Sequence, residues 1–154
     1  MSRNRRKSSG NKVEALSTRL KEKKEKLQQI LECLAEESAR GIPIIVEGKK
    51  DVETLRDLNV EGNIIPAKTG GKTVLDVVSE IEKTGAQEII LLLDFDRSGR
   101  ELMAKLKQHL EKTGLKLNSI FWRELSSLVR TEVKDVEGLA AYMETLEKKV
   151  GHLP

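Results

Sequence analysis

The chain has 154 residues, of which 38% are hydrophobic and 34% charged, and its formal net charge is +3. This is the length of one domain, which buries about two-thirds of its unfolded surface in a single core. No apolar run approaches the roughly 18 residues that span a bilayer, and the single cysteine, Cys33, excludes an internal disulfide and a cysteine-based zinc site.

The first twelve residues are basic, with no acidic side chain. Their five cations are Arg3, Arg5, Arg6, Lys7 and Lys12. We expect residues 1 to 12 to form a disordered tail, which serves either as an electrostatic arm on phosphate backbones or as a solvated terminus. The segment lacks the apolar core of a secretory signal, so we expect a cytoplasmic protein.

Residues 13 to 39 are predicted to form a long amphipathic helix. Apolar side chains recur with a heptad spacing at Val13, Leu16, Leu20, Leu27, Ile30 and Leu34. The pattern breaks where Lys23 and Glu37 take apolar positions. Two interpretations stay open: the helix pairs with a second copy or a protein partner as a short coiled coil, or it lies against the following domain.

Residues 41 to 150 alternate short apolar runs with amphipathic stretches. The apolar runs cover residues 42 to 46, 63 to 67, 88 to 93 and 116 to 122. Uniformly apolar strands suit a sheet covered on both faces, so we predict an α/β domain with a four-stranded parallel, Rossmann-like sheet flanked by helices. Asp135 is predicted to cap a last helix that runs to about Lys149, with Gly138 as a weak point.

The stretch "IIPAKTGGKT", residues 64 to 73, ends like a nucleotide-binding P-loop. That motif requires a glycine five residues before Gly71, where this chain has Pro66. Proline fixes φ and lacks the backbone N–H, so a Gly-Gly turn that opens a helix is the favoured interpretation. A P-loop-like nucleotide binder remains the alternative, since an apolar strand ending at Asp94 is also typical of such proteins.

Acidic residues follow two of the predicted strands. Glu47 ends the first strand, while Asp94 and Asp96 follow the third. Carboxyl ends of parallel strands meet at one edge of the sheet, so the three carboxylates are expected to share a site. Hard oxygen ligands suit Mg²⁺ or Mn²⁺, and such a site fits phosphoryl transfer, with metal on the aspartates and Glu47 as proton carrier.

The paired motifs "IIVEGKKDVETL" and, 47 residues after its glutamate, "DFDRSGREL" resemble the Toprim domain. This domain is shared by type IA and type II topoisomerases, bacterial primases, OLD-type nucleases, 5S ribosomal RNA maturases and small stand-alone proteins of archaea and bacteria. The resemblance covers about residues 41 to 140. It implies that Glu47 acts as general acid or base and contributes to the metal site, and that Asp94 and Asp96 bind Mg²⁺.

Further residues are expected at the edge of this site. The resemblance matches Gly48 and Gly99 to small turn residues, Asp51 to an acid that begins the first helix, and Lys134 and Asp135 to a Lys-Asp segment of primases. Cations near the predicted edge are expected either to hold phosphates or to be solvated: Lys49, Lys50, Lys68, Lys72, Arg97 and Arg100.

The function expected from these observations is Mg²⁺-dependent phosphodiester chemistry on RNA or DNA. A topoisomerase needs a nucleophilic tyrosine from another domain, whereas Tyr142 lies in a predicted terminal helix, and a primase needs further domains. A nuclease or nucleotidyl transferase in nucleic-acid processing is therefore the leading expectation. The alternative is a non-catalytic accessory module of a nucleic-acid or ribonucleoprotein complex, which uses the basic tail and the first helix for binding.

Overall fold

The apolar runs form the strands of one parallel sheet. The computed structural model describes the backbone of residues 2 to 151 and the side chains of residues 12 to 151. The strands are β1 (Ile44–Val46), β2 (Ile64–Pro66), β3 (Glu88–Leu91) and β4 (Lys116–Asn118), in the spatial order β2-β1-β3-β4. The prediction of a four-stranded parallel sheet is confirmed.

Alternation along each strand divides the core into two halves. Ile44 of β1 lies opposite Ile64 of β2 and Ile90 of β3, and all three belong to one apolar cluster. Ile45, one residue later, belongs to a second cluster on the other face. Because successive side chains in a strand point to opposite faces, both faces of the sheet must be covered by other elements.

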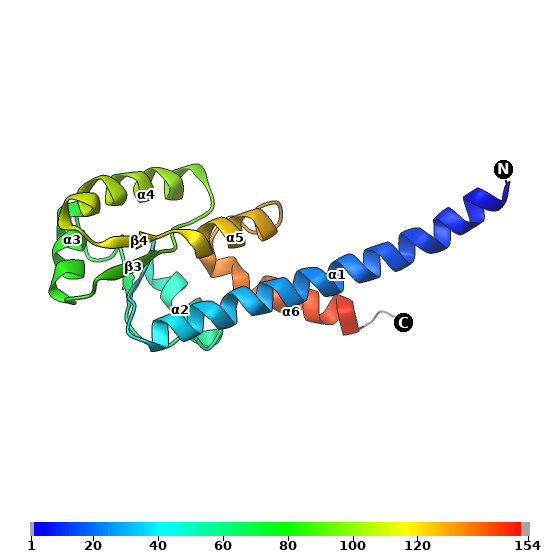
Figure 1. Ribbon diagram of the computed structural model, residues 1–154, viewed down its shortest axis with the longest axis horizontal. Coiled ribbons are helices and arrows are strands. Elements are labelled where there is room, and N and C mark those ends of the chain that lie inside the picture. Colours follow the sequence, from blue (N-terminus) through cyan, green and yellow to red (C-terminus); the bar gives the residue numbers. More distant parts are fainter. Residues whose placement is uncertain (1, 152–154) are drawn as a thin grey trace.

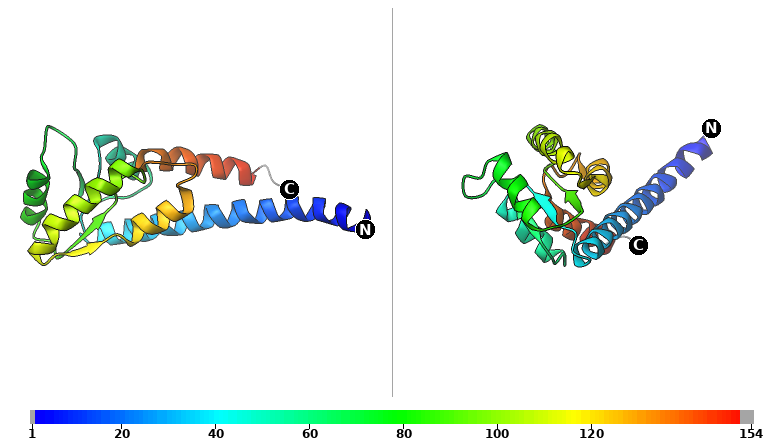
Figure 2. Two further views of the ribbon diagram at one scale, coloured as in Figure 1. Left: turned by 90° about the horizontal axis from the view of Figure 1, so that it is seen from above. Right: turned by 60° about the vertical axis from the view of Figure 1, so that its left-hand side comes forward.

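Helices cover both faces of the sheet, as Figures 1 and 2 show. One face is covered by α1 (Ser2–Ala39), α2 (Lys49–Asp57), α5 (Ile120–Val129) and α6 (Leu139–Gly151). The opposite face is covered by α3 (Val74–Lys83) and α4 (Arg97–Leu110). Two short 3₁₀ helices, η1 (Glu111–Thr113) and η2 (Val136–Gly138), complete the regular structure described. The molecule is therefore a three-layer α/β fold.

The sequence interpretation was wrong at the end of the fourth strand. Residues 120 to 122 were expected to continue the strand but form the first turn of α5. The side-chain oxygen of Asn118 accepts a hydrogen bond from the backbone N–H of Ile120 at 3.0 Å. This turn stops the strand, because asparagine side chains compete with the backbone ladder for its donors.

The C-terminal helical region begins at its predicted cap and is divided at its predicted weak point. Asp135 Oδ1 accepts a hydrogen bond from Gly138 N at 2.8 Å. The first turn is the 3₁₀ helix η2, and the α-helix proper, α6, begins only at Leu139. The predicted single helix is therefore two consecutive elements.

The C-terminal half of α1 is part of the domain. Leu27, Leu31 and Leu34 are buried in the cluster shared with α5 and α6. The Lys23 ammonium lies 3.1 Å from Glu132 Oε1. Of the two open interpretations, the second therefore holds for this half of the helix, which lies against the following domain.

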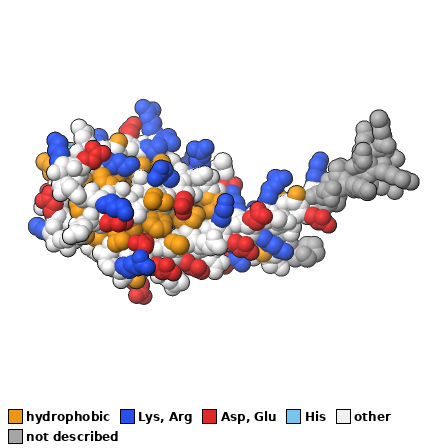
Figure 3. All heavy atoms as spheres, viewed as in Figure 1, with side chains coloured by type: hydrophobic (Ala, Val, Ile, Leu, Met, Phe, Trp, Pro, Cys, Tyr) orange, Lys and Arg blue, Asp and Glu red, His pale blue; other side chains and the backbone are white. Residues whose placement is uncertain are grey.

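The N-terminal half of α1 extends beyond the rest of the molecule (Figures 1 and 2). In this half Val13 and Leu16 are 59% and 56% exposed. Figure 3 shows lysine, arginine and acidic side chains interspersed along the described part of the helix. The backbone of residues 2 to 12 continues α1, where a disordered tail was expected. The basic side chains before Lys12 lie outside the described residues, so their role stays a prediction.

No helix within residues 2 to 151 combines the length and the apolar character that crossing a membrane requires.

Candidate functional site

The strand order creates a topological switch point between β1 and β3. From β1 the chain passes to β2 on one side, and it then crosses to β3 on the other side. Ligands of open α/β sheets bind outside the carboxyl ends of the strands at such a point. Glu47 directly follows β1, and continuing the β1–β3 register places it opposite Leu93, one residue before Asp94. The fold thus brings Glu47 and Asp94 to the same edge.

Asp94 carries a buried oxygen that has no protein partner. Among the described residues, Asp94 Oδ1 is the one buried side-chain oxygen or nitrogen without a hydrogen bond. A buried carboxylate oxygen left unpaired is costly, so this atom fits a bound cation or a donor from a ligand. The backbone around it is held firmly, since Phe95 N donates to Lys134 O at 2.7 Å.

Asp96 caps helix α4. Its Oδ1 accepts a hydrogen bond from Gly99 N at 2.8 Å. A Cβ added to Gly99 would lie 2.1 Å from the main-chain oxygen of Asp94, which leaves no room for a side chain. Gly99, the third residue of α4, therefore allows the first turn of this helix to pack directly on Asp94.

Glu47 is paired with a lysine from the neighbouring strand. Lys68, two residues after β2, places its Nζ 2.7 Å from Glu47 Oε1. The Glu47 side chain is 11% exposed and that of Lys68 is 52% exposed. The same Nζ lies 3.4 Å from Ser98 Oγ in the first turn of α4. Lys68 thus crosses from β2 over the end of β1 toward α4.

Asp51 joins the β1 edge to η2. Its Oδ2 accepts a hydrogen bond from Gly48 N and its Oδ1 from Glu137 N, both at 2.9 Å. Burial raises the pKa of Asp51 above its ordinary value; the two backbone hydrogen bonds oppose this shift, while the charges of Asp135 and Glu47 add to it. Gly48 itself has an extended backbone with φ −138°, which any residue adopts.

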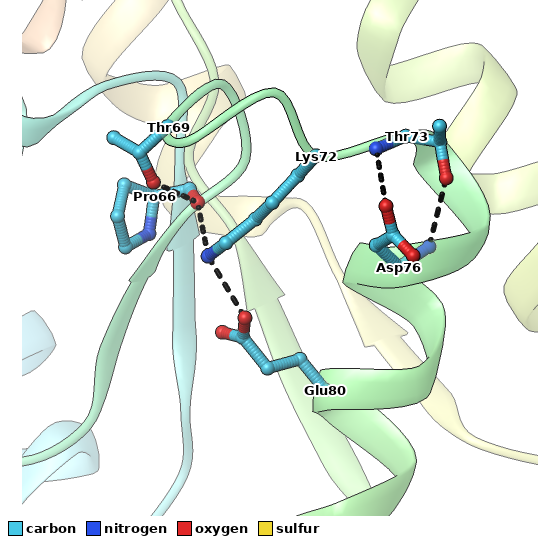
Figure 4. Close-up of polar contacts among 6 residues, drawn as sticks. All are labelled: Pro66, Thr69, Lys72, Thr73, Asp76 and Glu80. Atoms are coloured by element: carbon cyan, nitrogen blue, oxygen red, sulfur yellow. Dashed lines mark hydrogen bonds and ion pairs between the residues drawn. The ribbon is translucent and has the colours of Figure 1, made fainter.

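The loop between β2 and α3 is folded on itself (Figure 4). Lys72 Nζ donates to Pro66 O at 3.1 Å and lies 2.8 Å from Glu80 Oε1. Thr73 caps α3: its Oγ1 accepts from Asp76 N at 3.2 Å, and Asp76 Oδ2 accepts from Thr73 N at 2.8 Å. The Lys72 ammonium is therefore engaged by the end of β2 and by α3, which matches the favoured interpretation of a turn that opens a helix.

The remaining predicted cations are exposed. This group comprises Lys49, Lys50, Arg97 and Arg100. Arg97 Nε lies 3.1 Å from Glu101, and Lys50 Nζ lies 4.0 Å from Glu137. The side chains of Arg97 and Lys50 are nevertheless largely exposed to solvent. Exposed pairs of this kind contribute little to stability, so these cations remain free to meet an anion. Their phosphate-binding role stays a prediction.

The donor set at the edge fits a hard divalent cation that keeps much of its water. Within the described residues there is no group of three or more His, Cys, Asp or Glu side chains that could hold a metal ion. Mg²⁺ does not require such a group, because it is usually bound through one or two carboxylates together with water and phosphate oxygens. The unpaired Asp94 Oδ1 is the feature that fits such an ion.

Comparison with known proteins places the chain in a family. The Toprim domain model matches residues 42–124. The chain belongs to the Toprim family. This membership supports a metal-dependent role connected with nucleic acids, and it confirms the resemblance carried by the two motifs.

Relatives similar to this chain occur in archaea. A UPF0292 protein of Methanosarcina barkeri is 36% identical over 128 residues, covering 83% of this chain and 87% of the relative. A UPF0292 protein of Methanocaldococcus jannaschii is 39% identical over 120 residues, covering 77% and 91%. A solved structure described as a putative protein from Aquifex aeolicus has a TM-score of 0.59 and 28% identity, covering 71% of this chain and 94% of that one.

Two contacts at the site were not anticipated from the sequence. The indole N–H of Trp122 donates to the main-chain oxygen of Asp94 at 3.3 Å. The pairing of Lys68 with Glu47 depends on β2 lying beside β1. A parallel strand pattern does not specify neighbours, so neither contact had a signal in the sequence.

Proposed function

We propose that this Toprim protein carries out Mg²⁺-dependent phosphodiester chemistry on nucleic acid, and that it acts as a nuclease in RNA or DNA processing. The observation that carries the proposal is the buried, unpaired Asp94 Oδ1 at the switch point, beside the end of β1 where Glu47 stands. A preformed anionic position that lacks a protein donor suits a metal-assisted reaction.

Each acidic residue has a distinct role in the proposal. Asp94 and Asp96, with Glu47 contributing to the site, would hold Mg²⁺ or Mn²⁺, which supplies charge neutralisation at the phosphate and an acidified water. Glu47, which is mostly buried, takes or returns the proton of the attacking or leaving oxygen. Asp51 keeps the β1 edge in register with η2 through its two backbone hydrogen bonds.

Cations around the edge would orient the substrate. The exposed Lys49, Arg97 and Arg100 lie at the first turns of α2 and α4, which follow β1 and β3 directly. Phosphate contacts from such side chains position the backbone without reading sequence, so the proposal names nucleic acid as a class and no particular site.

The test is cleavage of end-labelled single- and double-stranded RNA and DNA with Mg²⁺, Mn²⁺ or EDTA. The natural protein is compared with Asp94→Asn and with Asp57→Asn, a matched control at the exposed C-terminal end of α2. We expect metal-dependent cutting that Asp94→Asn abolishes and Asp57→Asn retains. Equal cutting by all three proteins would reject the assignment of Asp94.

A second candidate function is that of a non-catalytic accessory module. It is favoured by the part of α1 that extends beyond the domain, where Val13 and Leu16 are exposed. In this case Leu16→Glu would abolish capture of a nucleic-acid or protein complex while the fold is kept, as measured by circular dichroism. Capture unaffected by Leu16→Glu, together with metal-dependent cleavage, would favour the enzyme.

A further inference from the structure

The carboxylate of Glu47 already has a cation beside it. Lys68 Nζ lies 2.7 Å from Glu47 Oε1 and 3.4 Å from Ser98 Oγ. It therefore stands between the acid assigned to proton transfer and the first turn of α4. An ammonium in this position neutralises the negative charge that would attract a divalent cation to the edge.

The main chain of Lys68 is fixed, so its position can change only through its side chain. Lys68 N donates to Glu47 O at 2.8 Å, and Ala67 N donates to Val46 O at 2.9 Å. These bonds continue the β1–β2 ladder beyond the strands. The loop that follows is tied to Pro66 O through Thr69 Oγ1 at 3.4 Å and Lys72 Nζ at 3.1 Å. The four-carbon stem of lysine is flexible and the Lys68 side chain is 52% exposed, so rotation away from Glu47 needs no backbone change.

We propose that Lys68 is a resident cation that a divalent metal displaces from Glu47. Two cations close to one carboxylate repel each other, and the divalent ion has the stronger attraction for the acidic edge. Metal binding then releases the Lys68 ammonium toward the α4 side, where it can meet a substrate phosphate. This inference rests on the proposed function for the identity of the edge as a metal site.

Metal affinity provides the first test. Mn²⁺ binding to the full chain is measured by electron paramagnetic resonance of the free ion, for the natural protein, Lys68→Gln and Lys72→Gln. Lys72 is the matched control, because it lies on the same loop but pairs with Glu80. We expect Lys68→Gln to bind Mn²⁺ about 10-fold more tightly and Lys72→Gln to stay within about 2-fold of the natural protein. Unchanged or weaker binding by Lys68→Gln would overturn the inference.

The position of the lysine itself provides the second test. Lysines are dimethylated with ¹³C, which keeps their charge, and the Lys68 signal is assigned by its loss in Lys68→Arg. We expect Mg²⁺ to shift this signal to the position that it has in metal-free Glu47→Gln. A Lys68 signal that neither Mg²⁺ nor Glu47→Gln moves would show that the ion pair is absent or is not displaced.

These experiments separate the inference from the proposed function. Tighter Mn²⁺ binding by Lys68→Gln in a chain that cuts no nucleic acid would support the displacement and reject the nuclease. Metal-dependent cutting with no effect of Lys68→Gln on affinity would reject the displacement alone. Absence of Mn²⁺ binding in both the natural protein and Lys68→Gln would overturn the inference.

Discussion

The indole N–H of Trp122 donates a hydrogen bond to the main-chain oxygen of Asp94 at 3.3 Å, although the two residues are 28 positions apart. Trp122 also packs 6.3 Å from Phe95, measured between ring centroids. Helix α5 thereby fixes the segment that carries the unpaired Asp94 oxygen. Gly99 supports the same segment from α4, so Asp94 is held from two elements.

Replacing Trp122 by phenylalanine tests this support. The change removes the hydrogen-bond donor and keeps an aromatic ring, so we expect a loss of about 0.5–1.5 kcal/mol in the free energy of unfolding. Weaker Mn²⁺ binding should accompany the loss, because the Asp94 backbone is less well fixed. Tyr142→Phe on α6 is the control, and it should leave Mn²⁺ affinity unchanged. If both variants keep the natural affinity, Trp122 has only a packing role.

Gly99→Ala is expected to be strongly destabilising. Its Cβ would lie 2.1 Å from Asp94 O and 2.6 Å from Asp94 C, both backbone atoms that cannot rotate away. Overpacking of this kind costs about 1–3 kcal/mol or more, measured by chemical denaturation. The neighbouring exposed Ser98→Ala should change stability by less than about 0.5 kcal/mol. Equal stability of the two variants would show that α4 can shift away from Asp94.

Asp51→Asn should lower stability, and the loss should depend on pH. The asparagine leaves one of two backbone N–H groups without its acceptor, which costs about 1–3 kcal/mol. Since burial raises the pKa of Asp51 above 3.8, the folded protein keeps the proton in a window where the unfolded chain has lost it. The stabilisation that protonation provides is complete below pH 3.8 and is lost as the pH rises through the raised pKa.

The difference in the free energy of unfolding between the natural protein and Asp51→Asn is therefore expected to be largest below pH 3.8 and to shrink as the pH rises. Denaturant unfolding from pH 3.5 to 7 measures it, with Asp57→Asn as a surface control. A difference that grows with pH would contradict the assigned direction of the pKa shift.

The two halves of α1 should respond differently to truncation. Leu27 is fully buried, so Leu27→Ala is expected to cost about 2–5 kcal/mol in unfolding free energy. Leu16 is 56% exposed, and Leu16→Ala should change the stability of the monomer by less than about 0.5 kcal/mol. A large, concentration-dependent effect of Leu16→Ala would indicate that this half is covered by a second copy.

Much of the fold could be predicted because its elements are encoded locally. The runs at Ile44, Ile64 and Ile89 are apolar on both faces, which is typical of covered parallel strands, and each lies within a strand of the structure. The run that ends at Trp122 was predicted to be one strand, but Asn118 stops the strand with a side-chain hydrogen bond. The apolar residues that follow belong to helix α5. Apolar periodicity alone does not distinguish these cases.

The site was predictable only in part. Glu47 and Asp94 could be placed at one edge because both follow apolar strands in a parallel sheet. The partner of Glu47 could not be predicted, because Lys68 reaches it only when β2 lies next to β1. Strand neighbours are determined by how the helices pack on the sheet, which is a long-range property. The same holds for Trp122, whose contact with Asp94 spans two elements.

The role of Asp94 is tested by the rate of Mg²⁺-dependent phosphodiester cleavage by the natural protein and by Asp94→Asn, on the nucleic acid that the substrate panel selects. We predict cutting that EDTA abolishes and that Asp94→Asn reduces by about 100-fold or more, since a metal-bound transition state loses its main ligand. Cutting by Asp94→Asn at the natural rate, or no cutting of any of the four substrate classes by the folded natural protein, would contradict the proposed nuclease function.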